Sequence, residues 1–307
     1  MRNDLLKKGI HISVILPTYN RTYAFRQILF PGLERQSYKN FEIVIVDDGS
    51  DDGTDDFLSS GDFHDQFPVL AKRVRFLRNE RNIGAPASRN KGAENAEGDW
   101  LYIVEDDVQI DDPDYLKKAS TILEKVAKDV AVVSPKRAES KMTGYYKNPE
   151  HSFVRIGRLS GEIYMDPTQE YSGFVPNTHA SSFIRKDVFL RHKEDEKAFF
   201  GNTFRDESDL YFRIVKSGKK IFYVGDVLKT VHRNDIALKG GQKKINSSSL
   251  FQRDLIEIRN HYRYLRKNKY SFLEFRILAY FCVRWLRHAS NMLRIAWLKN
   301  LTAFYRI

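Results

Sequence analysis

The sequence predicts an α/β fold: a mostly parallel sheet with helices on both faces and a helical extension at the C-terminal end. Short apolar runs alternate with longer segments of helical pattern between residues 12 and 134, which is typical of parallel sheets. The runs are apolar at nearly every position, so we expect strands buried on both faces. Polar or acidic residues directly follow three of the runs, at the edge where such sheets bind ligands.

The first half of the chain carries the clearest pattern. The expected strands are 12–16, 41–46, 73–77, 100–104 and 130–133, and the expected helices are 21–36, 85–96 and 113–128. A further short helix is expected before Phe57, because Asp51, Asp52 and Thr54 are capping residues. Pro113 suits the first position of its helix.

The second half is less regular. Residues 135–178 are rich in Lys, Gly, Tyr and Pro, are expected to form loops and short strands, and carry no recognisable motif. Strands are expected at 180–185, 220–224 and 227–231, the last leading directly to His232. Residues 236–249 contain paired glycines and three consecutive serines, and we expect a flexible loop that closes over a bound ligand.

Positive charge is concentrated at the C-terminal end. The 307 residues carry a net charge of +11, and residues 250–307 hold twelve Lys or Arg against three acidic residues, so this tail contributes +9. Such an asymmetry favours an anionic partner near the tail. Nucleic acid is not expected, because no nucleic-acid-binding module is recognisable.

Residues 1–10 are polar and predict no signal peptide, and the single Cys282 excludes an internal disulfide. We therefore expect a cytoplasmic protein.

The tail has the pattern of a basic amphipathic helix. At helical spacing Arg276, Arg287 and Arg294 share one side, while Phe281 and Trp285 lie on the other. The longest stretch without charge is 277–283, which is far shorter than a membrane span. Two interpretations stay open: the tail lies on the inner face of an anionic membrane, or it packs on the body or on a second copy in a homodimer.

Glu105, Asp106 and Asp107 follow the strand 100–104 without interruption. Adjacent carboxylates repel one another unless a cation compensates them, so a hard divalent ion bound together with a phosphate-bearing ligand is their natural partner. Asp47 and Asp48 follow the strand 41–46 in the same way, and both groups are expected at one crevice. The alternatives are a solvated turn or helix cap for the first group and turn formation for the second.

Four motifs in this order resemble family two glycosyltransferases of the GT-A fold, a Rossmann-like fold. They are ILPTYN at 15–20, EIVIVDDGSDDGT at 42–54, NIGAPASRNKG at 82–92 and GDWLYIVEDD at 98–107. The resemblance implies an inverting transferase that uses a nucleotide-diphosphate sugar, such as a UDP-, GDP- or dTDP-sugar, with Mn²⁺ or Mg²⁺. The residues that it implies for donor binding are Pro17, Thr18, Tyr19, Asp47, Asp48, Glu105 and Asp106.

Metal binding is assigned by the same resemblance. The acidic triplet matches the family's Asp-X-Asp motif with Glu105 in place of the first Asp, so Asp107 and Glu105 are the expected ligands. In this fold a histidine after the last strand completes the metal site, which points to His232, and imidazole suits Mn²⁺. A lone histidine with a structural role is the alternative. Asn82 and Arg89 are suited to donor contacts near a helix N-terminus, and a structural ion pair is the alternative for Arg89.

A second acidic group begins the segment 202–218, which resembles the family's acidic pair followed by Asp-Leu and a helix. The family's catalytic base maps onto Glu207, with Asp206 as the alternative and helix capping as the structural alternative for both. Asp209 is expected to support the site.

Together these observations predict a metal-dependent enzyme that moves a sugar onto a hydroxyl of a glycan or lipid-linked glycan. The expected division is a catalytic domain at 1–235, with a nucleotide-sugar half at 10–134 and an acceptor half at 135–235, then the loop 236–249 and the helical extension 250–307. The alternative is a catalytically silent nucleotide-sugar-binding or interaction protein.

Overall fold

The structure is a computed structural model that describes residues 9–140, 154–156, 160–161, 163–165, 170–199, 205–233, 235–236 and 250–282. Its strands fall into three groups within these residues. The central sheet contains β1 (Ile12–Thr18), β2 (Phe41–Asp47), β3 (Val74–Arg78), β4 (Trp100–Ile103), β6 (Val130–Ser134), β10 (Ser172–Val175), β11 (Phe183–Arg185) and β12 (Lys220–Val224). A smaller sheet contains β5 (Val108–Gln109), β7 (Lys136–Glu139) and β13 (Lys229–His232), and β8 (Val154–Ile156) pairs with β9 (Ile163–Met165).

The central sheet has the strand order β10-β12-β6-β11-β4-β1-β2-β3. β1 pairs in parallel with β2 and β4, β2 with β3, and β6 with β12. β11 is antiparallel to both β4 and β6, and β10 is antiparallel to β12. The predicted α/β class with a mostly parallel sheet is therefore confirmed.

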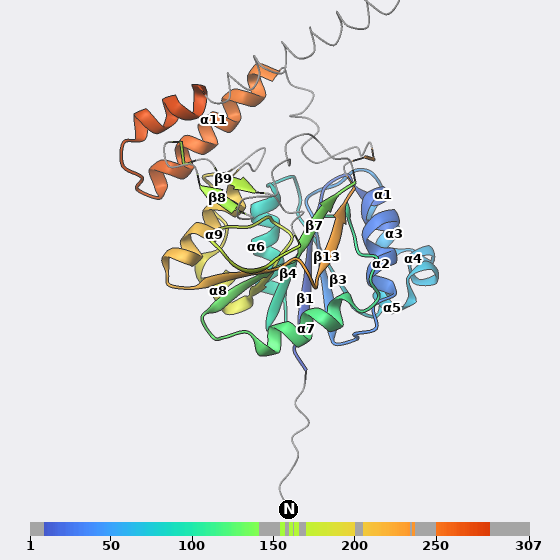
Figure 1. The fold of residues 1–307 in the computed structure, drawn as a ribbon. Coiled ribbons are helices and arrows are strands. Elements are labelled where there is room, and N and C mark those ends of the chain that lie inside the picture. The colour runs from blue at the N-terminus through green and yellow to red at the C-terminus, as the bar shows by residue number, and fades with distance from the viewer. Residues whose placement is uncertain are drawn as a thin grey trace, which may run out of the picture.

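Helices cover both faces of this sheet (Figure 1). They are α1 (Thr22–Ala24), the π-helix η1 (Phe25–Leu29), α2 (Phe30–Glu34), α3 (Thr54–Ser59), α4 (Gly61–Gln66), α5 (Pro68–Ala71), α6 (Ala85–Asn95), α7 (Tyr115–Lys125), α8 (Lys186–His192), α9 (Asp206–Lys216) and α11 (Leu250–Lys267). A further helix runs through 273–282. The helix predicted at 21–36 is thus three consecutive pieces with a π-turn in the middle.

Two apolar cores explain why the strands are apolar at successive positions. Ile12, Val14 and Leu16 point into a core that includes the aromatic residues of α2 to α5 and the buried face of α7. Ile15 points to the opposite side, into a core shared with α6, α8 and α9. Because successive side chains of a strand alternate between faces, burial on both faces requires this uninterrupted apolar pattern.

The carboxyl ends of β1, β2 and β4 meet at one edge of the sheet. Thr18 at the end of β1 is in register with Asp47 at the end of β2, and β4 leads directly into the acidic residues 105–107. β13 pairs with β5, which follows those residues, and thereby brings His232 to the same edge. The fold alone thus gathers side chains that are far apart in the sequence.

The first part of the tail packs against the body rather than standing apart. Tyr264 and Leu265 of α11 are fully buried in the core that also contains α9. Asn268 and Lys267 donate hydrogen bonds to the buried Asp209 of α9, at 2.9 and 2.8 Å. No helix among the described residues combines the length and the apolar character needed to cross a bilayer. The predicted loop at 236–249, apart from Ile236, lies outside the described residues, as do the tail residues 283–307, including Arg287 and Arg294.

Candidate functional site

Asp47 and Asp48, the acidic residues after β2, hold the loops around the crevice. Asp47 is fully buried and accepts hydrogen bonds from the amide and hydroxyl of Ser50 and from Arg78, the last at 2.7 Å. Asp48 accepts from the side chain of Asn79 at 2.9 Å and from the backbone amides of Ile83 and Gly84 at 3.0 and 2.8 Å. These bonds fix the turn after β2 and the loop before α6, as the turn-forming alternative anticipated.

The other predicted donor residues lie around these two loops. Pro17 and Tyr19 are partly exposed beside the buried Thr18, and Asn82 is exposed in the loop before α6. The Thr18 hydroxyl lies 3.5 Å from Oδ2 of Asp106. The loop after β1 therefore touches the acidic loop after β4, so both lie at the same crevice.

Arg21 places a positive charge between two carboxylates of the acidic loop. Its Nη1 lies 3.4 Å from Asp106 Oδ1 and 3.3 Å from Asp107 Oδ2. Burial, and then the neighbouring charge of Asp107, raises the pKa of Asp106 to about 8, although Arg21 acts in the opposite direction. Asp106 therefore holds its proton near neutral pH, which leaves Asp107 as the charged member of the pair.

Asp107 faces His232. Oδ1 of Asp107 lies 3.6 Å from Nε2 of His232. Burial by itself raises the pKa of Asp107, but His232 and Arg21 together outweigh burial, so its pKa lies below the usual range. Glu105 turns toward a different cation, Arg137, whose Nη1 lies 3.3 Å away. Asp106 and Asp107 thus share Arg21, whereas Glu105 is paired with a different cation.

A divalent cation fits this corner with only two protein ligands. Within the described ranges no group of three or more His, Cys, Asp or Glu side chains converges as a complete metal site. The ionised Asp107 and the adjacent imidazole of His232 are nevertheless suitable donors for Mn²⁺. Hard divalent ions bound with phosphates often take one or two protein ligands and complete their shell with phosphate oxygens and water. The donor set therefore fits a metal that is bound together with a diphosphate.

The acidic pair at the start of α9 lies over a buried arginine. Nη2 of Arg89 donates to Glu194 Oε2 at 2.7 Å and to Asp206 Oδ2, and all three residues are buried. Glu207 is partly exposed and follows the buried Asp206 directly in the first turn of α9. Burial, then the charge of Asp206, raises the pKa of Glu207 well above its ordinary value. Of the two, only Glu207 retains access to a ligand.

The segment 177–182 connects the two acidic regions. Asn177 donates to the backbone carbonyl of Ser208 in α9 at 3.1 Å, and the Tyr211 hydroxyl of α9 donates to the carbonyl of His179 at 3.0 Å. His179 is buried, and burial, followed by the charge of Arg137, lowers its pKa to about 3. A neutral histidine therefore stands between the acidic loop and α9, and this segment fixes their relative positions.

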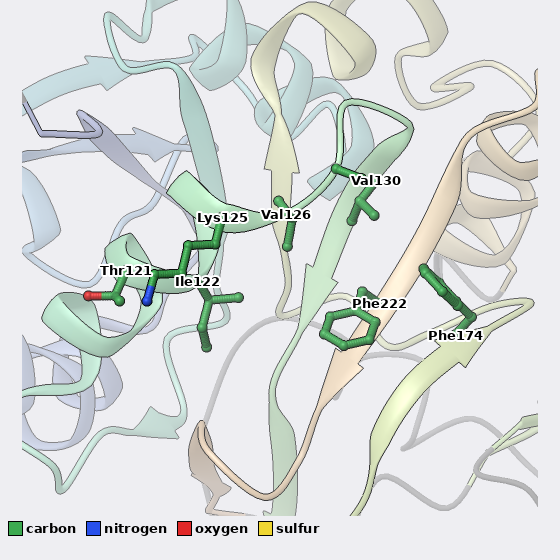
Figure 2. A pocket seen from close by; sticks show the side chains of 8 residues that line it. Thr121, Ile122, Lys125, Val126, Val130, Phe174 and Phe222 are labelled. Carbon is green, nitrogen blue, oxygen red and sulfur yellow. The ribbon is translucent and has the colours of Figure 1, made fainter.

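A second feature, an apolar groove, lies away from these side chains. A cavity of about 390 Å³ opens between the end of α7 and the strands β6, β12 and β10, lined by Ile122, Val126, Val130, Phe174 and Phe222 among others (Figure 2). It contains no acidic side chain, so it offers no chemistry of the kind gathered at the strand ends.

Comparison with known proteins agrees with the site geometry. The sequence profile of Glycosyl transferase family 2 matches residues 13–192. The chain belongs to this family. Among curated glycosyltransferases, GlyG of Streptococcus pneumoniae serotype 4 is 27% identical over 256 residues, covering 80% of this chain and 77% of GlyG. GlyA of the same organism is 34% identical over 179 residues, but the match covers 58% of this chain and only 23% of GlyA.

Solved glycosyltransferases share the fold of this family 2 member. GalNAc-T7 in complex with UDP, GalNAc and Mn²⁺ superposes with a TM-score of 0.61 at 17% identity, covering 85% of this chain and 48% of that one. The mannosyltransferase PcManGT from Pyrobaculum calidifontis superposes with a TM-score of 0.54 at 17% identity, covering 94% and 81% of the two chains. The GT-A fold expected from the four motifs is confirmed.

Several side chains of the site had no sequence signal of their own. Arg21 and Arg137 pair with carboxylates of the acidic loop. The only sequence indication for Arg21 was its position directly after the motif at 15–20. Glu194 lies in the charged run 193–197, which has the pattern of a solvated loop. Only the packing of α6 against α8 and α9 brings Glu194 to Arg89.

Proposed function

We propose that this chain is an inverting glycosyltransferase that transfers a sugar from a nucleotide-diphosphate sugar to a hydroxyl of a glycan or lipid-linked glycan. The observation that carries the proposal is the joint placement of two carboxylate regions with opposite tasks. Asp107 and His232 lie together at one side, where they would hold a cation, and Glu207 lies at the start of α9, where it would accept a proton. The segment 177–182 contacts α9 and places His179 near His232 and Arg137.

As the sugar leaves the donor, the negative charge that develops on the diphosphate leaving group must be neutralised. GalNAc-T7 was solved with UDP and Mn²⁺ and PcManGT with GDP-Man and Mn²⁺, which supports a nucleotide sugar and a divalent cation here. Asp107 and His232 would hold the cation, which when bound stabilises the negative charge that develops on the diphosphate. Arg21 lies beside Asp107 and contributes further positive charge at the same corner.

The acceptor half needs a base. The attacking hydroxyl loses its proton as it bonds to the anomeric carbon, and the nucleoside diphosphate leaves from the opposite face, which inverts the configuration. Glu207 suits the role because it is partly exposed, whereas Asp206 is buried and bound to Arg89. A carboxyl with a raised pKa is the stronger base once it is ionised. Nothing in this mechanism requires a covalent intermediate.

A thermal-shift panel tests the proposal. UDP-, GDP- and dTDP-sugars are added to the purified chain with Mn²⁺, with Mg²⁺ and with a chelator. We expect one nucleotide class to raise Tm, and the rise to require a divalent ion. A tenfold excess of ligand over Kd stabilises by about 1.4 kcal/mol, which is several degrees for a small domain and less for a chain of this length. If no nucleotide sugar changes Tm under any condition, the proposal fails.

We further propose that the tail brings the enzyme to an anionic membrane. The supporting observation is a set of exposed apolar side chains on the helix through 273–282: Phe275, Leu278 and Phe281 are 56%, 60% and 50% exposed, and Phe272 just before the helix is 80% exposed. Residues 250–282 carry seven Lys or Arg against three acidic residues. Each cation near an anionic leaflet contributes about 1 kcal/mol, and apolar side chains that enter the interface add to this.

Co-sedimentation with vesicles decides this second proposal. Wild-type protein should pellet with vesicles rich in anionic phospholipid and not with neutral vesicles, and the double change Phe275→Glu with Leu278→Glu should abolish pelleting. Phe174→Glu is the matched control, since Phe174 is 59% exposed on the body. Charge reversal at Arg276, Arg287 and Arg294 should weaken binding as well. If the wild type stays in solution, the membrane proposal fails and the tail is a structural or dimerisation element; a dimer that the double change disrupts would identify it as the latter.

A further inference from the structure

Three segments are tied together beneath Glu207. Asn90 of α6 exchanges two hydrogen bonds of 2.9 Å with the backbone of Glu194, one as donor and one as acceptor. Arg213 of α9 donates to the carbonyls of His192 and Lys193 from the other side. The short segment 192–194 is therefore fixed between α6 and α9, with its Glu194 carboxylate directed to Arg89.

Arg89 joins these segments through charge. Its Nη2 donates to both Glu194 and Asp206, and the three side chains are 6%, 5% and 1% exposed. Such a bridge is much stiffer than an exposed ion pair, because removal of either partner leaves a buried charge uncompensated. Asp206 cannot rotate without losing this bond, and Glu207 follows it directly in the first turn of α9.

The charges of this cluster do not balance. Within the bridge one guanidinium, that of Arg89, faces the carboxylates of Glu194 and Asp206, so with both ionised the bridge has one negative charge in excess; Arg213, which also acts on Glu194, is itself paired with Asp209. A further charge on Glu207 is opposed by the neighbouring charge of Asp206, which together with burial raises the pKa of Glu207. Other ionisable groups beside the cluster are Tyr211, whose pKa is raised by burial, Arg213, which acts on Glu194, Glu196, which accepts from Asn90, and the buried Arg205 directly before Asp206.

We propose that Arg89 and Glu194 are positioning residues for Glu207: the buried bridge from Glu194 through Arg89 to Asp206 fixes the carboxyl pair and sets the charge against which Glu207 gives up its proton. The proposal rests on the proposed function, because it takes Glu207 as the base. Neither residue touches the substrate. Their effect reaches the reaction only through the geometry and charge of the pair.

Substitutions of Glu194 and of Arg89 should then shift the pKa of Glu207 in opposite directions. Glu194→Gln keeps the shape and an oxygen acceptor for Arg89 but removes a negative charge, so Glu207 should ionise about one pH unit lower. Arg89→Gln removes the only positive charge of the bridge and should shift the ionisation about one unit higher, and Arg89→Lys should restore it. Glu94→Gln is the control, because Glu94 lies on the same helix in an exposed pair with Lys193.

Two measurements test this on the full chain. Carbon-13 NMR of labelled Glu carboxyl groups, with the Glu207 signal assigned by its loss in Glu207→Gln, follows the ionisation directly. The fall of kcat at low pH, the acid limb of its pH profile, reports the same ionisation of Glu207. We expect both to move down in Glu194→Gln and to stay in place in Glu94→Gln. If Arg89→Gln does not fold, the shift measured in Glu194→Gln is sufficient to test the proposal.

The outcomes separate this proposal from the proposed function. If the Glu207 signal titrates in Glu194→Gln as in the wild type, the charge role of the bridge is refuted, whatever the enzyme's activity. If the signal moves but the acid limb of transfer does not, Glu207 is not the base, and the positioning role is refuted together with that assignment. If no transfer is found with any nucleotide sugar, the proposed function fails, and the NMR titration still decides the effect of Glu194.

Discussion

Asp209 is the point at which the tail is fastened to the catalytic body, and its removal gives the sharpest test of this packing. The carboxylate is fully buried and accepts from Arg213 Nε at 2.8 Å, Lys267 Nζ at 2.8 Å and Asn268 Nδ2 at 2.9 Å. The first bond lies within α9, whereas the other two come from α11 and the residue just after it. Asp209→Asn therefore replaces an acceptor of three hydrogen bonds by an amide that also presents donors to two cations.

The expected cost follows from these contacts. A hydrogen bond to a charged group contributes about 1.5–3 kcal/mol. Adding three such values would overestimate the destabilisation by Asp209→Asn, because two of the three donors are partly exposed. Arg213 and Lys267 are 21% and 29% exposed and recover hydration, and Lys267 keeps Asp195 at 2.6 Å. Asn268 is buried and keeps its bond to the carbonyl of Tyr264 at 2.9 Å, so only its bond to Asp209 is at risk. We therefore expect Asp209→Asn to lower the free energy of unfolding by about 2–4 kcal/mol.

Asp187 provides the matched control. It also pairs with an arginine four residues later, Arg191, but its side chain is 67% exposed. Asp187→Asn should change the free energy of unfolding by less than about 0.5 kcal/mol. Urea denaturation at pH 7 measures both variants, and limited proteolysis should show faster cleavage between α11 and the body in Asp209→Asn alone. If the two variants are equally stable, the fastening role of Asp209 is wrong.

Three further predictions concern the site and the tail. Asp107→Ala should remove the Mn²⁺-dependent part of nucleotide-sugar affinity in calorimetry; unchanged binding in the presence of metal would contradict the ligand assignment. His179 is buried with a pKa near 3, so only the unfolded chain takes up its proton below pH 6.5. Wild-type stability should therefore fall by about 1.4 kcal/mol per pH unit from this group between pH 6.5 and 4, and His179→Gln should show a shallower fall in pH-dependent urea denaturation. High salt should release the wild type from anionic vesicles, and persistence in 1 M salt would argue against an electrostatic contribution.

Strands with a local signal were predicted closely. The segment 220–224 coincides with β12, and the segments 12–16 and 41–46 lie inside β1 and β2, because each is an apolar run with clear breakers. β10 lies in the region 135–178, where short strands were expected but none was located, since its sequence Ser-Gly-Phe-Val is short and pairs at the sheet edge with β12, far away in the chain. The antiparallel insertion of β11 between β4 and β6 is likewise decided by tertiary packing.

The site residues likewise divide into those with a local sequence signal and those placed only by tertiary packing. Asp107, Glu105 and His232 were predicted as metal ligands from the motifs and strand order. Asp107 and His232 lie side by side, whereas Glu105 is paired with Arg137. Arg89 was left open between the donor and an ion pair, and the structure gives it two buried carboxylate partners. Glu194 was not selected at all. Burial of an ionisable side chain depends on which helices pack over it, and a run of charged residues carries no information about that.

The role of Glu207 is the central claim, and single-turnover transfer tests it most directly. Glu207→Gln and Asp206→Asn are compared with the wild type, using the donor identified by thermal shift and an acceptor that the wild type uses. Glu207→Gln should bind the donor within about twofold of the wild type and lose transfer by a factor of about 10²–10⁴, the usual contribution of a general base. If Glu207→Gln transfers at the wild-type rate while Asp206→Asn does not, the base is Asp206 and the assignment made here is wrong.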